Sequence, residues 1–138
     1  MDISDKPDEV RKLLASSKVI AVVGASDKPD RPSYDIASYL LSAGYTMIPV
    51  NPGRPEILGQ KCYPSLKAVP VRVDIVNIFR NPADVPPIVD EAIAAGARSV
   101  WMQTGIASPE AAKKASDAGL EVLQDRCIKV AHKLLTSK

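Results

Sequence analysis

The sequence predicts a single doubly wound α/β domain of the Rossmann-like kind, with a five-stranded parallel sheet and helices on both faces. Two observations lead to this fold class. Short runs of β-branched and other apolar residues alternate with stretches of helical length along nearly the whole chain. Glycines also stand where the helical stretches end and the strands begin. Because parallel strands are joined by crossovers that usually contain a helix, this alternation favours a sheet covered on both sides.

The expected elements form five strand–helix pairs after an N-terminal helix. Strands are expected at residues 19–24, 46–50, 73–79, 99–103 and 120–123, and helices at 7–16, 32–43, 83–95, 109–118 and 126–135. The segment 53–71 is the least regular, with a short helix expected at 65–68. A length of 138 residues predicts one domain over residues 1–138, with an N-terminal helical segment at 1–17 and the core at 18–135.

Local signals mark several helix boundaries. Gly44, Gly96 and Gly119 each follow a helical stretch and precede a strand, the place where a residue in the left-handed conformation closes a helix. Ser108 precedes Pro109, which is the pattern of an N-cap followed by proline at the first helical position. These signals predict the crossover helices independently of the hydrophobic pattern.

Charge and hydropathy exclude two classes of partner. The chain has 18 Lys and Arg against 16 Asp and Glu, for a net charge of +2, and these charges are spread along the sequence. Such a balance gives no electrostatic footprint for nucleic acid or an anionic membrane. The longest apolar run, near residues 19–23, is far shorter than the roughly 20 residues of a membrane span, and the acidic start lacks the basic region of a signal peptide. We expect a cytoplasmic protein.

Metal sites and disulfide frameworks are not expected either. Cys62 and Cys127 are the two cysteines and His132 is the single histidine. Two cysteines in a chain with an ample core are expected to be thiols, since disulfide frameworks belong to small secreted domains. The sequence has no paired Cys and His spacing that would hold zinc. We therefore predict no metal ligand.

The ends of the expected strands carry the residues that could bind a ligand. In open parallel sheets ligands bind beyond the carboxyl ends of the strands. Each corner here combines a helix start, a glycine or proline and a polar or cationic side chain, and the basic side chains are Lys28, Arg31, Arg54, Arg80 and Arg126. Guanidinium groups match phosphate oxygens, so this edge is predicted to bind a phosphorylated anion. Solvated loop residues are the alternative for each one singly.

The first turn differs from the dinucleotide fingerprint. That motif has three glycines, as in G-x-G-x-x-G, and an acidic residue at the end of the second strand. Here Gly24 stands alone, Pro29 and Pro32 interrupt the loop, and the second strand ends at Asn51. This pattern disfavours NAD as the ligand.

The motifs at these corners resemble those of a known family. They are Gly24-Ala-Ser26, Arg31-Pro-Ser-Tyr34, Pro49-Val-Asn-Pro52, Val73-Asp-Ile-Val76 with Phe79-Arg80, Val100-Trp-Met-Gln-Thr-Gly-Ile106 and Asp125-Arg-Cys127. Taken together, they resemble the small CoA-binding domain family, whose fold is shared with the N-terminal domain of the succinyl-CoA synthetase α subunit. The resemblance runs from about residue 19 to 135.

This resemblance implies a domain that binds coenzyme A across the strand ends. By position, the loop 26–31 corresponds to the part that cradles the phosphates, Arg54 to a CoA-contacting lysine, and residues 79–82 and 102–104 to segments lining the adenine and pantetheine. The loop departs from the synthetase's glycine-rich version. The predicted binding residues are Gly24, Ala25, Ser26, Lys28, Arg31, Ser33, Tyr34, Asn51, Pro52, Arg54, Phe79, Arg80, Met102, Gln103, Thr104, Gly105 and Cys127.

No catalytic residue is assigned to this chain. In the synthetase the phosphorylated histidine lies in a second domain of the α subunit, and His132 matches no such residue; it is expected at the surface, near the last carbonyls of its helix. The expected function is therefore binding of CoA or acyl-CoA as a carrier, sensor or accessory. The alternatives are an NAD(P)-linked or acyl-CoA enzyme, or a subunit that completes a synthetase with a partner chain. Homodimerisation through the terminal helix is left open.

Cys127 has two interpretations. It is expected at a helix start beside Arg126, and both features favour the thiolate, so it could form a mixed disulfide with bound CoA. The alternative is a structural cysteine that fills a small apolar space. Trp101, inside the fourth expected strand, is interpreted as a core residue rather than a stacking platform.

Overall fold

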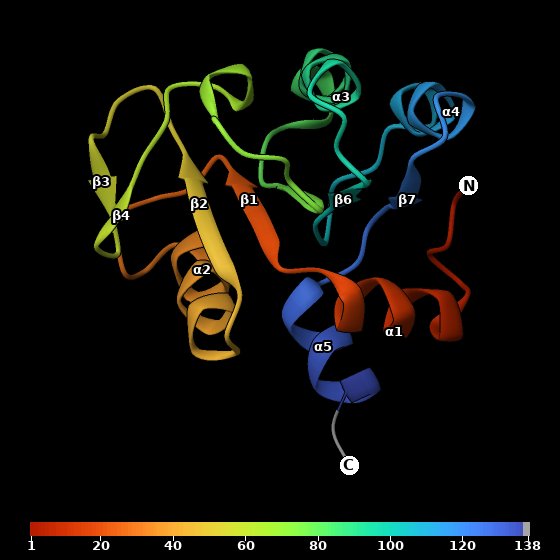
Figure 1. Ribbon diagram of the computed structural model, residues 1–138, viewed down its shortest axis with the longest axis horizontal. Coiled ribbons are helices and arrows are strands. Elements are labelled where there is room, and N and C mark those ends of the chain that lie inside the picture. Colours follow the sequence, from red (N-terminus) through yellow and green to blue (C-terminus); the bar gives the residue numbers. More distant parts are fainter. Residues whose placement is uncertain (137–138) are drawn as a thin grey trace.

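The sheet of the computed structural model, which describes residues 1–136, has five parallel strands in the order β2-β1-β5-β6-β7 (Figure 1). The strands are β1 (Val19–Val23), β2 (Thr46–Val50), β5 (Ile75–Ile78), β6 (Ser99–Met102) and β7 (Glu121–Leu123). All five predicted strands and their parallel pairing are thereby confirmed. The last two residues of the predicted 1–138 domain lie outside the described residues.

Helices cover both faces of the sheet, as predicted. They are α1 (Pro7–Ser16), α2 (Pro32–Ser42), α3 (Val85–Ala94), α4 (Pro109–Asp117) and α5 (Ile128–Thr136). In Figure 1, α3 and α4 lie above the sheet, and α1, α2 and α5 lie below it. Each face has its own core because side chains alternate along a strand: Val76 and Ile78 of β5 pack toward α3 and α4, whereas Ile75 packs toward α1, α2 and α5.

The predicted helix boundaries hold to within a few residues. The Ser108 hydroxyl accepts a hydrogen bond of 3.3 Å from the backbone N–H of Ala111, so Ser108 caps α4 as expected. The helix predicted at 83–95 begins with a 3-10 turn, η2 (Pro82–Asp84), before α3. The short helix expected at 65–68 is the 3-10 turn η1 (Leu66–Ala68).

The irregular segment contains a hairpin that the sequence analysis did not predict. Strands β3 (Glu56–Ile57) and β4 (Gln60–Lys61) pair antiparallel around Leu58 and Gly59. Both turn residues have positive φ, 55° and 73°, as a two-residue type I′ turn requires. Leucine is rare at such a position, so the usual Asn-Gly or Asp-Gly signal was missing.

Short segments pair with both edge strands of the sheet. At one edge, the Ile3 N–H donates to the Val122 carbonyl at 2.8 Å, and Asp2 forms a parallel bridge with Val122. At the other edge, Tyr63 bridges Val50, and its backbone N–H donates to the Pro49 carbonyl at 3.1 Å. Along residues 1–136, no helix has the length and apolar character needed to cross a bilayer.

Candidate functional site

The strand order places a crevice at the carboxyl ends of β1 and β5. These strands are neighbours, but the helix after β1 (α2) covers one face of the sheet and the helix after β5 (α3) covers the other. The two connections diverge at this switch point and leave space between them. Gly24 directly follows β1 and Phe79 directly follows β5, so both lie at the crevice.

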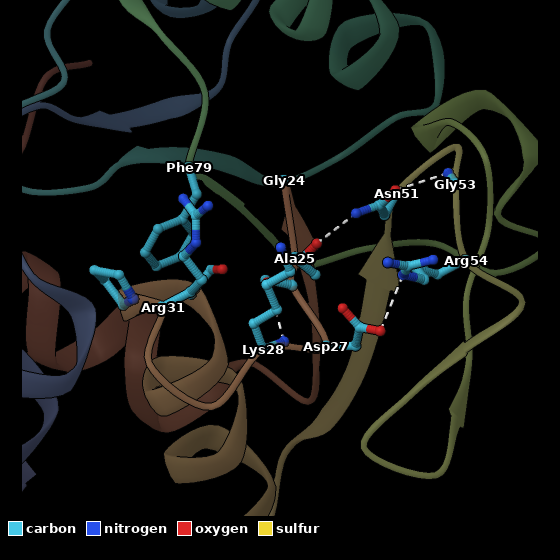
Figure 2. Close-up of a pocket in the computed structure, with 12 residues that line it drawn as sticks. Gly24, Ala25, Asp27, Lys28, Arg31, Asn51, Gly53, Arg54 and Phe79 are labelled. Atoms are coloured by element: carbon cyan, nitrogen blue, oxygen red, sulfur yellow. Dashed lines mark hydrogen bonds and ion pairs between the residues drawn. The ribbon is translucent and has the colours of Figure 1, made fainter.

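A groove of about 560 Å³ opens there, which we call the Gly24 groove (Figure 2). In Figure 2, Phe79 and Arg31 lie together on one side of it, and Asn51 and Arg54 lie on the other. The groove gathers most of the predicted binding residues from three chain segments. It is lined by Gly24, Ala25, Ser26, Asp27, Lys28, Arg31, Pro32, Ser33, Asn51, Gly53, Arg54 and Phe79.

At Gly24 the first loop lies close to the backbone that follows β5. Its φ is +89°, and a Cβ added there would lie 2.7 Å from the backbone oxygen of Phe79 and 3.1 Å from Cδ of Arg80. Its N–H donates to the Val50 carbonyl at 3.0 Å. Because Gly24 has no side chain, the loop can lie directly against the end of β5, and no Cβ projects from this position.

Asn51 holds two loops of the groove in place. Its Nδ2 donates to the Ala25 carbonyl at 2.8 Å, and its Oδ1 accepts from the Gly53 N–H at 2.7 Å. The Ser26 hydroxyl accepts from the Lys28 N–H at 3.1 Å and tightens the first loop further. Asn51 was predicted as a binding residue, and the structure shows that both ends of its amide are engaged by protein.

Three cationic side chains line the groove: Lys28, Arg31 and Arg54. Arg54 is paired with Asp27 at 2.9 Å, and both side chains are close to half exposed. The N-terminal end of α2 also borders the groove, and its N-cap residue Arg31 makes no side-chain capping bond. The partial positive charge of an uncapped helix start adds to the cationic side chains, so the groove is suited to an anion.

Two predicted residues lie on the other side of Gly24. Pro52 and Arg80 line a hollow of about 250 Å³ that faces α3. Arg80 is paired there with Asp84 at 3.4 Å. The predicted cationic edge is therefore divided, with Arg80 separated from Lys28, Arg31 and Arg54 by the Gly24 backbone.

Two others line a more apolar groove between α1 and α5. This groove has a volume of about 510 Å³, and Thr104 and Cys127 border it together with Val130 and Leu134. Arg126, at the same corner, is paired with Asp5 at 2.6 Å rather than directed to the Gly24 groove. Cys127 is partly buried, and Cys62 is buried; both are free thiols.

The remaining predicted residues line neither the Gly24 groove nor the other two hollows. Met102 is fully buried in the core beneath α3 and α4, away from either groove. Gly105 donates its N–H to the Asp125 carboxylate at 2.7 Å, and the Tyr34 N–H donates to the Arg31 carbonyl in the first turn of α2. Gln103 is 6% exposed at the carboxyl end of β6.

Trp101 and His132 are both structural. The indole Nε1 of Trp101 donates to the Arg126 carbonyl at 2.9 Å, and the side chain is fully buried, as predicted for a core residue. His132 was expected at the surface, but it lies edge-on against Tyr39 and Tyr45, and its Nδ1 is 2.6 Å from the Tyr39 hydroxyl. Burial lowers the pKa of His132. This cluster is at the amino-terminal ends of β1 and β2, opposite the Gly24 groove.

The sequence analysis missed three residues that the structure brings to the site. Asp27 was part of the first strand-end loop, but its pairing with Arg54 joins residues far apart in the chain. Pro32 and Gly53 also line the Gly24 groove. Within residues 1–136, no group of three or more His, Cys, Asp or Glu side chains is arranged to hold a metal ion.

Residues 18–133 match the family described as CoA binding domain, which is most of the chain. The chain belongs to the CoA-binding domain family. An uncharacterized protein of Bacillus subtilis, YneT, is 43% identical over 124 residues, which cover 90% of this chain and 92% of that protein. A hypothetical protein from Pyrococcus horikoshii OT3 has the same fold, with a TM-score of 0.94, 39% identity and coverage of 99% of this chain and 97% of that one.

The family relationship extends to larger enzymes. The ADP-forming acetate–CoA ligase I of Archaeoglobus fulgidus is 30% identical over 121 residues, which are 80% of this chain but 18% of the ligase. The dinucleotide-forming acetyl-coenzyme A synthetase 1 of Ca. Korarchaeum cryptofilum superposes with a TM-score of 0.68 and 32% identity, over 77% of this chain and 25% of the synthetase. This CoA-binding domain is therefore homologous to one part of such synthetases.

Proposed function

We propose that this protein binds CoA or acyl-CoA in the Gly24 groove and acts as a carrier, sensor or accessory of CoA metabolism, without chemistry of its own. The observation that supports this most is the gathering of Lys28, Arg31 and Arg54 around an uncapped helix start at the switch point of a CoA-binding domain. A ligand rich in phosphate suits this charge.

In this proposal, different parts of CoA contact different residues. The phosphates rest on the loop 24–31, where Gly24 allows a close approach and the three cations supply charge. The pantetheine arm then crosses Phe79, and the thiol end is directed toward Gln103, Gly105 and Cys127. Asp27 is paired with Nε of Arg54, so its carboxylate competes with a bound phosphate for this guanidinium group.

Asn51 supports CoA over a nicotinamide dinucleotide. In dinucleotide-binding domains an acidic residue follows the second strand and binds the ribose hydroxyls. Here Asn51 occupies that corner, and its amide is already bonded to Ala25 and Gly53. This position therefore has no carboxylate that could bind ribose hydroxyls.

Isothermal titration of the whole protein with CoA, acetyl-CoA, NAD and ATP tests the proposal. CoA and acetyl-CoA are expected to bind more tightly than NAD and ATP, and Arg54→Ala is expected to weaken CoA binding. Arg11→Ala is the matched control, because Arg11 lies on α1 outside the groove, where it pairs with Asp8. Tighter binding of NAD than of CoA, or no binding of CoA, would overturn the proposal.

The homologous ligases favour a second candidate function. Since the chain corresponds to 18% of the Archaeoglobus ligase, it could serve as the CoA-binding subunit of a synthetase whose other domains are on a partner chain. Under the first proposal, the protein alone produces no acetyl-CoA from acetate, ATP and CoA. Acetyl-CoA formation on addition of a defined partner that lacks a CoA-binding domain would support the second candidate instead.

A further inference from the structure

A buried polar side chain near the carboxyl edge of the sheet has no role in the fold described so far. Asn77 lies within β5 among apolar residues and is fully buried. Within residues 1–136, its Oδ1 has no hydrogen-bond partner. Leaving a buried carbonyl oxygen unpaired is unfavourable, and an apolar residue would pack in this strand without that cost. The position of its other end, Nδ2, supplies the explanation.

Asn77 and the start of α5 together fix the side chain of Gln103. The Oε1 of Gln103 accepts hydrogen bonds of 3.2 Å from Asn77 Nδ2 and 3.2 Å from the backbone N–H of Ile128. A backbone N–H can only donate, so the Gln103 atom facing it must be the oxygen. The Asn77 atom facing the same oxygen must then be its NH₂ group, and this leaves Asn77 Oδ1 unpaired.

The orientation of Gln103 follows from these two bonds. With Oε1 held from inside the protein, the NH₂ group of Gln103 is turned the other way. This NH₂ group has no hydrogen-bond acceptor among the described residues. Among these residues, Asn77 Oδ1 is the buried side-chain polar atom without a partner, so the Gln103 NH₂ group is not fully enclosed. It accounts for part of the 6% of Gln103 that is exposed. Gln103 therefore presents N–H donors in a fixed direction at the carboxyl end of β6.

We propose that the Gln103 NH₂ group donates to an amide carbonyl of the pantetheine arm of CoA, and that Asn77 is the positioning residue that aims it. This inference rests on the proposed function. The end of β6 lies two strands from β1, about 10 Å at the usual spacing of strands, beyond Phe79 on the proposed course of the arm. A neutral donor of fixed orientation suits an amide carbonyl, whereas the cations at the first loop suit the phosphates.

Two ligands and two variants test this proposal by titration calorimetry. CoA has the pantetheine arm, and adenosine 3′,5′-bisphosphate lacks it. Gln103→Glu keeps the acceptor for Asn77 and Ile128 but removes the NH₂ donor, and Asn77→Leu removes one of the two hydrogen bonds that hold the Gln103 amide. Both variants are expected to weaken CoA binding by about two- to tenfold, the range for one neutral hydrogen bond, and to leave binding of the bisphosphate unchanged.

The double variant separates positioning from packing. Because Asn77 acts through the Gln103 donor, Asn77→Leu is expected to cause no further loss of CoA affinity when Gln103→Glu is already present. Gln124→Ala is the matched control at the end of the next strand, where Gln124 bonds to Ser108 and Asp2. It is expected to bind CoA as the unmodified protein does.

The outcomes distinguish this inference from the proposed function. If the unmodified protein binds CoA and both single variants bind it equally well, the Gln103 contact is wrong while the CoA site stands. If the unmodified protein binds no CoA, both fall. Should Asn77→Leu fail to fold, NMR of the unmodified protein decides: CoA, and not the bisphosphate, must shift the side-chain NH₂ signals of Gln103, and unshifted signals overturn the inference.

Discussion

Replacing Gly24 by alanine is expected to destabilise the protein strongly. The new Cβ would lie 2.7 Å from the Phe79 carbonyl oxygen and 3.1 Å from its carbon, and both are backbone atoms that cannot move aside alone. A side chain at φ +89° costs roughly 1–2 kcal/mol, and forced overpacking costs roughly 1–3 kcal/mol more. The sum, about 2–5 kcal/mol, is a large part of the 5–15 kcal/mol typical of folded domains. Urea unfolding measures this difference.

Gly44→Ala is the matched control for this experiment. Gly44 has a similar φ of +96°, but nothing lies within 4 Å of its Cβ position. Its replacement is therefore expected to cost only the conformational part, roughly 1–2 kcal/mol. If Gly24→Ala lowers the free energy of unfolding by no more than Gly44→Ala does, the first loop is not pressed against β5 as described, and the shape of the groove would have to be revised.

Three further changes test the charges in the structure. Asp27→Asn is expected to strengthen CoA binding by about two- to fivefold, measured by calorimetry, because Arg54 no longer has a competing carboxylate. Burial opposes ionisation of Asp74, but hydrogen bonds from the backbone N–H groups of Val19 and Lys18, together with the charges of Arg98 and Arg72, outweigh it and lower its pKa. Its stabilising effect is therefore complete at neutral pH and lost as the pH falls through that lowered pKa, so in urea unfolding Asp74→Asn should reduce the loss of stability in acid. Burial lowers the pKa of His132, so folding resists its protonation; thermal stability should fall as the pH drops below 6.5, and His132→Phe should remove that dependence.

Each of these has a result that would contradict it. Weaker CoA binding by Asp27→Asn would mean that the carboxylate holds Arg54 in its binding position rather than competing for it. Equal acid sensitivity of Asp74→Asn and the unmodified protein would assign no role to the Asp74 contacts. A His132→Phe protein that keeps the original pH dependence would place the titrating group elsewhere.

The fold could be predicted because its signals are local. Apolar runs of strand length, a cap such as Ser108 and helix-ending glycines each depend on a few adjacent residues, and they agreed with one another. The hairpin β3–β4 was missed for the same reason: Leu58 stands where an asparagine or aspartate would have announced the turn. Its conformation is set by pairing within the folded protein, which the local sequence does not reveal.

The site could be predicted in part. Strand ends converge by topology, so Gly24, Lys28, Arg31 and Arg54 were expected at one edge, and the Gly24 groove brings them together. Contacts between distant segments decide which of these side chains are already bonded to other protein groups, and the local sequence does not show those contacts. Asn77 did carry a signal that was not used, since it is a lone amide inside an apolar strand. Its partner Gln103 is separated from it by a whole helix and a strand.

The two short pairings at the borders of the sheet cover part of each edge strand. An exposed strand edge offers unpaired N–H and C=O groups to which other chains can add. Residues 1–3 occupy part of that position beside β7, and Tyr63 does so beside β2. Trimming the first three residues would uncover the border of β7 and convert it into a template for intermolecular strand addition, so the shortened protein should be more prone to form aggregates rich in cross-β structure.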